Sequence, residues 1–178
     1  GFLTPWNYPI TLAASDAIPA LMAGNAALIK PDVQTSLSAM WVIDVMREAG
    51  VPANVVQIVT GEGPVVGPMV TDRVDYVMFT GSTRVGREIA ARCGERLIGC
   101  SLELGGKNAM IVRADADVDR AAEIAVRACF SNSGQLCISM ERIYIHTEVY
   151  AAFREAFAAR VLRMVLADVD GQDPICPA

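Results

Sequence analysis

The chain has 178 residues, of which 53% are hydrophobic, 20% charged and 6% aromatic. This composition excludes a disordered chain, and five cysteines, an odd number, argue against a small disulfide-stapled scaffold. The net charge of −5 argues against nucleic acid or an anionic membrane as a partner. With one histidine and no Cys-x-x-Cys pair, the sequence offers no basis for a zinc site, and we predict no metal.

The first 29 residues carry a single charge, at Asp16, and are apolar enough to suggest a membrane span. Prolines, a glycine and asparagines interrupt the run, and no basic residue precedes it, which favours a buried segment of a soluble protein. The scattered cysteines indicate a reducing compartment, so we expect a cytoplasmic protein. Because the chain begins at Gly1 without Met and ends in Asp-Pro-Ile-Cys-Pro-Ala, we predict that both ends are incomplete.

Short apolar runs alternate with helical patterns through the first hundred residues, which is typical of a parallel sheet with helices packed on it. Strands are predicted at 24–30, 55–59 and 76–79, and helices at 35–49, 63–71 and 83–93. The face of the 35–49 helix is predicted to carry Leu37, Met40, Trp41, Asp44 and Val45.

A second αβ unit is predicted to begin near residue 100. It comprises strands at 97–104, 109–112 and 142–146, a helix from Val118, and a final helix with Tyr150, Phe153, Phe157, Val161 and Met164 on its apolar face. Asp115, Asp117 and Asp119 have the spacing of an EF-hand loop, but Arg120 and Val126 occupy its sixth and twelfth positions. We therefore interpret the aspartates as residues at a helix N-terminus.

Four features of the sequence could carry chemistry. The stretch TGSTRVG, from Thr80 to Gly86, follows a strand and opens a helix, so it is either a phosphate-binding turn or an ordinary turn. Cys137 follows Ser-Gly-Gln in a predicted turn and is either an accessible nucleophile or an inert thiol. Glu103 is either a costly buried carboxylate or an outward-facing strand residue. Asn7 is either a turn residue or a fixed amide donor.

Five motifs in this order resemble the aldehyde dehydrogenase superfamily: PWNYP at 5–9, LIKP at 28–31, FTGST..G at 79–86, LELGGKN at 102–108 and GQLC at 134–137. The resemblance extends to about residue 165, and residues 166–178 do not continue the family pattern. Because superfamily members have several hundred residues, the chain is interpreted as a central fragment. The resemblance implies an α/β fold, with part of a parallel Rossmann-type cofactor domain at 1–101 and the start of an α/β catalytic domain at 102–178.

The resemblance also implies catalytic roles. Cys137 would attack the aldehyde carbonyl to give a thiohemiacetal, and its oxyanion would be held by the amide of Asn7 and the backbone N–H of Cys137. Hydride transfer to a nicotinamide would leave a thioester, and Glu103 would activate the water that hydrolyses it. The implied substrate is an aldehyde, the implied cofactor is NADP or NAD, and the full-length parent is expected to be a homo-oligomer.

The cofactor residues follow from the same motifs. Lys30 would bind ribose hydroxyls, Ser82 the pyrophosphate, and Leu104 would approach the nicotinamide. Trp6 would line the pocket, while Thr80, Gly81 and Gly86 belong to the phosphate-binding turn. Val33 occupies a position where many NAD-preferring relatives have Glu, which favours NADP, although Asp32 could substitute for that Glu.

Within the superfamily, GNAALIKPD, ELGGKNAMIV and RACFSNSGQLCISMERIYI are similar to bacterial succinate-semialdehyde dehydrogenases. An Arg that some of those enzymes use to hold the substrate carboxylate is absent, because Ala14-Ser15-Asp16 stands there. The alternatives are a CoA-acylating relative, which Glu103 disfavours, a non-catalytic protein that keeps the fold, and a Cys–His hydrolase using His146.

Overall fold

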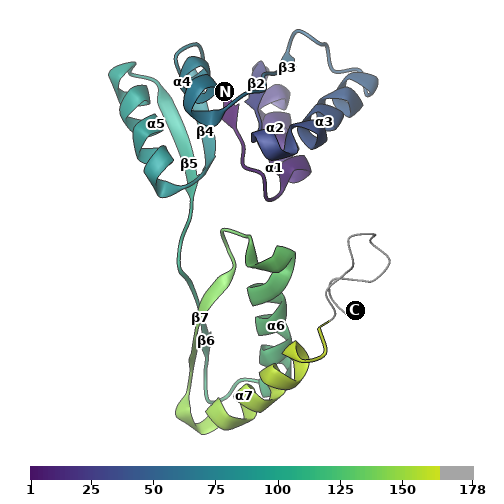
Figure 1. Cartoon of the computed structure of the whole chain (residues 1–178), viewed down its shortest axis with the longest axis vertical. Helices are drawn as coiled ribbons and strands as arrows, with labels where there is room; N and C mark the ends of the chain where they lie inside the picture. The colour runs from purple at the N-terminus through teal and green to yellow at the C-terminus, as the bar shows by residue number, and fades with distance from the viewer. Residues whose placement is uncertain (165–178) are drawn as a thin grey trace. The chain divides into compact units, whose positions relative to one another are not determined.

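The structure, a computed structural model, describes residues 1–164 (Figure 1). The chain divides into two units, Gly1–Gly105 and Gly106–Ala178, each with its own core. The boundary between the units lies between Gly105 and Gly106, four residues beyond the predicted domain boundary after residue 101. Glu103 and Leu104 therefore belong to the first unit. The expected end of the family pattern, at 166–178, lies outside the described residues.

The first unit is built on a parallel five-stranded sheet with the strand order β3-β2-β1-β4-β5. Phe2 lies opposite Ile29 on one side and Met78 on the other, so the shortest strand is the centre of the sheet. The predicted parallel sheet is therefore confirmed, with a central strand that the sequence pattern did not indicate. The strands are β1 (Phe2–Leu3), β2 (Ala27–Lys30), β3 (Val56–Ile58), β4 (Tyr76–Gly81) and β5 (Gly99–Leu104).

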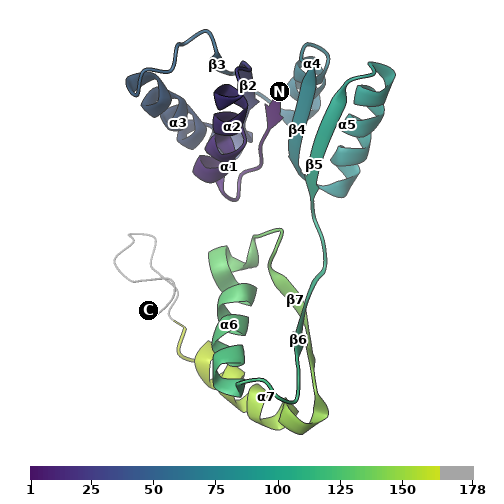
Figure 2. The same cartoon turned by 180° about the vertical axis from the view of Figure 1, so that it is seen from behind.

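Helices cover both faces of this sheet (Figure 2). Phe2 packs into a core with α1, α2 and α3, whereas its neighbour Leu3 packs into a second core with α4 and α5. Alternation of side chains along a strand produces this two-sided packing. The helices are α1 (Pro9–Ser15), α2 (Ala17–Met22), α3 (Ser36–Glu48), α4 (Gly63–Thr71) and α5 (Thr83–Glu95), and the 3₁₀ turn η1 (Val33–Thr35) precedes α3.

The residues predicted to share one face of α3 do lie together, and that face is exposed. Leu37 is 80% exposed and Trp41 is also exposed, whereas the buried residues follow the neighbouring stripe with the same helical spacing. Small Ala39 lies fully buried on that stripe, where it allows close approach to α1. The buried residues of α3 are Ala39, Val42, Ile43 and Met46.

The strand predicted from residue 97 begins later. Leu97 has a left-handed φ of 56° and is 94% exposed, because it belongs to the turn that ends α5. Its N–H donates to the carbonyl of Gly94, and regular pairing starts at Gly99 opposite Tyr76.

The second unit places two parallel strands beside two helices, as the βαβα pattern predicted. Val112, Ala122, Ala125 and Phe153 form its core, and the ring of Phe157 stacks on Phe153 with centroids 5.8 Å apart. Asp117 caps the first helix by accepting from the N–H of Arg120, which confirms the interpretation of the aspartates. The elements are β6 (Asn108–Val112), α6 (Val118–Phe130), the 3₁₀ turn η2 (Ser131–Gly134), β7 (Met140–Ile145) and α7 (Thr147–Val161).

The apolar N-terminal run forms β1, α1, α2 and β2. Within residues 1–164, no helix has both the length and the apolar character needed to cross a membrane.

Candidate active site

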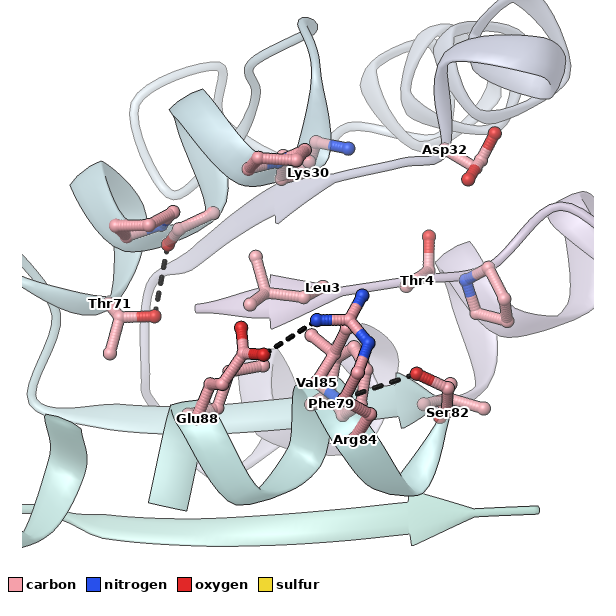
Figure 3. A pocket seen from close by; sticks show the side chains of 18 of the residues that line it. Leu3, Thr4, Lys30, Asp32, Thr71, Phe79, Ser82, Arg84, Val85 and Glu88 are labelled. Carbon is pink, nitrogen blue, oxygen red and sulfur yellow. Dashed lines mark hydrogen bonds and ion pairs between the residues drawn. The ribbon is translucent and has the colours of Figure 1, made fainter. Parts of the chain in front are cut away.

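A cavity of about 550 Å³ lies where β1 and β4 end. In a sheet with this strand order, the connections leave in opposite directions from these two strands, and ligands bind at that switch point. Thr4 after β1, Lys30 at the end of β2, Asp32 beyond it and Ser82 after β4 line the cavity (Figure 3). Trp6 lines it as well.

Lys30 is the buried cation of this cavity. It is only 6% exposed, and burial lowers its pKa, while Asp32 and Glu62 act in the opposite direction. No carboxylate among residues 1–164 forms an ion pair with its Nζ. An ammonium group in this setting suits hydroxyl or phosphate oxygens of a ligand.

Asp32 is engaged locally. Its Oδ1 accepts a hydrogen bond of 3.0 Å from the N–H of Gln34 and so caps η1. One of its two carboxylate oxygens is therefore already used by the backbone.

The N-terminus of α5 opens beside the cavity. Ser82 is its N-cap, and the Oγ of Ser82 accepts from the N–H of Val85 at 3.3 Å. The remaining N–H groups of the first turn have no partner within the helix, and the helix dipole favours an anion there. Arg84 and Glu88 of the same helix form an ion pair of 2.7 Å, which Figure 3 marks along the cavity wall.

Asn7 and Glu103 lie at the same edge of the sheet. Glu103 is opposite Thr80 near the end of β5, and Asn7 follows β1, which neighbours β4. Glu103 is exposed, which matches the outward-facing reading of this carboxylate. Burial raises the pKa of Asp16, and the negative charge of Glu103 adds to that shift.

Cys137 belongs to the second unit and lies in a turn between η2 and β7, as predicted. Its side chain is exposed. By contrast, Cys93 is buried and Cys129 half-buried, and burial raises the pKa of both thiols. Cys137 is thus the most accessible thiol of the described residues.

The sequence model of the aldehyde dehydrogenase family matches residues 1–177. This chain belongs to the aldehyde dehydrogenase family. The match shows that the expected loss of the family pattern after residue 165 was wrong, since the family sequence continues to residue 177.

Among relatives of this aldehyde dehydrogenase chain, a protein of Mycolicibacterium smegmatis is 52% identical over 94% of the chain. It carries the provisional name succinate-semialdehyde dehydrogenase (NADP+). The 3-sulfolactaldehyde dehydrogenase of Priestia aryabhattai is 40% identical over 98% of the chain. The crystal structure of a succinate-semialdehyde dehydrogenase from Burkholderia pseudomallei superposes with a TM-score of 0.94 at 35% identity, covering 98% of this chain and 37% of that one.

The chain spans about a third of these relatives: 32% of the first protein and 37% of the second. It is therefore similar to one section of longer enzymes, and the α/β fold seen here is part of theirs.

Within this aldehyde dehydrogenase chain, five of the expected cofactor residues line the cavity: Trp6, Lys30, Thr80, Gly81 and Ser82. Three do not. Val33 is 42% exposed in η1, and Gly86 is buried against Leu104, where an added Cβ would come within 2.6 Å of Leu104 Cδ2. Gly86 thus brings α5 close to β5, which is a packing role.

Sequence reasoning missed the contribution of α4 to the cavity. Gly63, Pro64, Gly67 and Pro68 line it, and an added Cβ at Gly67 would meet no atom within 4 Å. The signal was present, because the Gly-Pro pair repeats after four residues and so marks one small-residue face of a helix.

His146, considered above as a hydrolase partner of Cys137, was expected in a strand. It instead caps α7, and its Nδ1 accepts from the N–H of Glu148 at 3.4 Å. Nothing in this geometry activates a thiol.

Proposed function

We propose that the full-length parent of this chain oxidises an aldehyde to a carboxylic acid with NADP+ or NAD+, through a covalent intermediate on Cys137. The cavity at the β1–β4 switch point supports the cofactor most directly, because it combines an unpaired buried ammonium, an open helix N-terminus and a small-residue wall. The exposure of Cys137 supports its role as nucleophile.

The residues of the chain would act in sequence. The Cys137 thiolate attacks the carbonyl carbon, and the resulting oxyanion accepts hydrogen bonds from the Asn7 amide and the Cys137 N–H. The cofactor, when held by the cavity residues, would supply the hydride acceptor needed to convert the thiohemiacetal on Cys137 to a thioester. Glu103 then takes a proton from water, the hydroxide attacks the thioester, and the acid leaves as the Cys137 sulfur is released.

The cofactor would be held by residues of the cavity. Lys30 would bind the ribose oxygens, while Ser82 and the first turn of α5 would face the pyrophosphate. The open face of α4 would leave room for the adenosine portion.

NADP is the favoured cofactor. Val33, the neutral neighbour of the cavity-lining Asp32, adds no negative charge there, and one carboxylate oxygen of Asp32 already accepts a hydrogen bond from the N–H of Gln34. Val33→Glu should therefore lower kcat/KM for NADP relative to NAD by more than about tenfold, since a charge clash of about 1.4 kcal/mol suffices. A parent that prefers NAD, or an unchanged ratio in the variant, would contradict the assignment.

The substrate is proposed to be a small aldehyde with an acidic group, such as succinate semialdehyde. Two relatives are named for succinate semialdehyde and 3-sulfolactaldehyde, and both names denote acidic aldehydes. The stretch Ala14-Ser15-Asp16 has no cation where some succinate-semialdehyde dehydrogenases place an Arg, so the acidic group would be bound by other parts of the parent.

The decisive experiment follows reduced cofactor by absorbance in the full-length parent, with succinate semialdehyde and each cofactor. Cys137→Ala should abolish aldehyde oxidation, whereas the matched control Cys129→Ala should keep most of it. An active Cys137→Ala variant would refute the proposal. If cofactor is reduced only when CoA is present and an acyl-CoA is the product, the acylating alternative would be favoured instead.

A further inference from the structure

Asn108 holds the turn that carries Cys137. It is the first residue of β6, and its side-chain Nδ2 donates to two backbone carbonyls, that of Cys137 at 2.6 Å and that of Ser139 at 3.1 Å. An amide nitrogen carries two hydrogens, so one is available for each carbonyl.

An irregularity in the strand pairing lies at the same place. Asn108 is opposite Met140, but Ala109 is opposite Arg142, so Glu141 is an extra residue in β7. Such bulges redirect side chains and are frequent next to active sites. Glu141 pairs with Lys107, so the charged groups beside Asn108 neutralise each other.

The other side of the turn is tied to α6. Ser139 is buried, and its Oγ points at the carbonyl oxygens of Ala128 and Cys129, each 3.2 Å away. Between Cys129 and Ser139 the chain passes through three consecutive residues with left-handed backbone, Asn132, Ser133 and Gly134. Two of these are not glycine, and such backbone is retained only where the surroundings fix it.

We infer that Asn108 is a positioning residue for the nucleophile, an inference that rests on the proposed function of Cys137. Its two hydrogen bonds fix the direction of the peptide that follows Cys137, and thereby the path of the thiol toward an aldehyde carbonyl. Misplacing a reacting atom by about 1 Å can slow a reaction on the order of a hundredfold.

The first test uses Asn108→Leu in the full-length parent, because leucine keeps the size of the side chain and removes both donors. The matched control is Asn25→Leu, which removes a single 3.1 Å bond from Asn25 to the carbonyl of Ala20 in the first unit. Asn108→Leu should lower the burst rate of cofactor reduction at least about tenfold, with KM for the aldehyde changed less than about threefold. The control should stay within about twofold of wild type in both.

A second variant separates positioning from mere support of the fold. In Asn108→Asp the ionised carboxylate faces two carbonyl oxygens, whereas the protonated acid supplies one O–H donor. The ratio of its kcat/KM to that of wild type should therefore rise as the pH is lowered from about 8.5 to about 6, because the two oxygens favour the neutral acid. A purely structural defect would give a flat ratio.

The outcomes are distinct. If Cys137→Ala is active, the proposed function has failed and this inference fails with it. If Cys137→Ala is inactive but Asn108→Leu matches Asn25→Leu, only the inference is overturned. If Asn108→Leu does not fold, a flat pH ratio for Asn108→Asp overturns the inference and a rising ratio supports it.

Discussion

Gly86 and Gly94 occupy the same helix, α5, and a methyl group added at each should have opposite effects. At Gly86 the new Cβ would lie 2.6 Å from Leu104 Cδ2 and 3.3 Å from Leu104 Cδ1. At Gly94 it would meet no atom within 4 Å. Comparing the stabilities of Gly86→Ala and Gly94→Ala therefore separates the effect of close packing of α5 on β5 from the general preference of helices for alanine.

The expected changes in the free energy of unfolding follow from two contributions. Replacing a helical glycine by alanine stabilises the folded state by about 0.5–1 kcal/mol. Overpacking a well-filled contact costs about 1–3 kcal/mol. Gly94→Ala should thus raise the free energy of unfolding by up to about 1 kcal/mol, and Gly86→Ala should lower it by up to about 2 kcal/mol.

Urea denaturation provides the assay. Both tryptophans of the chain, Trp6 and Trp41, lie in the first unit, so their fluorescence reports the unfolding of that unit. In a Leu104→Ala background the penalty of Gly86→Ala should disappear, since the clashing methyl groups are gone. Equal stabilisation by Gly86→Ala and Gly94→Ala would show that Leu104 moves aside freely, and would refute the packing argument.

Three further outcomes are expected. Brief treatment with iodoacetamide should modify Cys137 first, because burial raises the pKa of Cys93 and Cys129; earlier labelling of either in peptide mass spectra would contradict this. In the parent, Glu103→Gln should give a burst of reduced cofactor followed by slow turnover, because an amide cannot take a proton from water; loss of the burst would place Glu103 in an earlier step. The hydrogen bond from Arg92 lowers the pKa of Asp72, so this carboxylate stabilises the fold above its unfolded pKa of about 3.9 and loses that effect as the pH falls toward its folded value. Urea midpoints measured from about pH 5 downward should therefore fall less steeply in Asp72→Asn, and an unchanged slope would argue against the ion pair.

Local sequence signals, such as turn residues and apolar spacing, made much of the fold predictable. The helix at 63–71 was predicted with the bounds that α4 has, and in the structure Gly-Pro opens this helix and Asp72 follows its last residue. Most elements of the second unit were predicted, because its apolar spacing changes clearly between strand and helix periods, but the strand assigned to it at 97–104 is β5 of the first unit. The turn at Cys137 followed from Ser-Gly-Gln in the same way.

Other features depend on tertiary contacts that no local pattern contains. β1 has two residues and is a strand only because β2 and β4 flank it. Two adjacent stripes of α3 are apolar, and the sheet selects the one with Ala39. The position of Cys137, just after the left-handed residues Asn132 and Ser133, depends on a hydrogen bond from Asn108 of β6, which lies 29 residues away in sequence.

The position of β1 also has a consequence for the order of folding. Phe2 must find both Ile29 and Met78, and the second pairing closes a loop of more than seventy residues. The entropy lost on closing a loop grows with its length, so contacts within the β2–β3 and β4–β5 halves are favoured earlier. The pairing of Phe2 with Ile29 closes a loop no longer than that of the β2–β3 pairing. We therefore expect β1 to join β2 and β3 early and its contact with β4 to form last, which makes the pairing of Phe2 and Leu3 with Met78 and Phe79 the step that commits this unit to its native state.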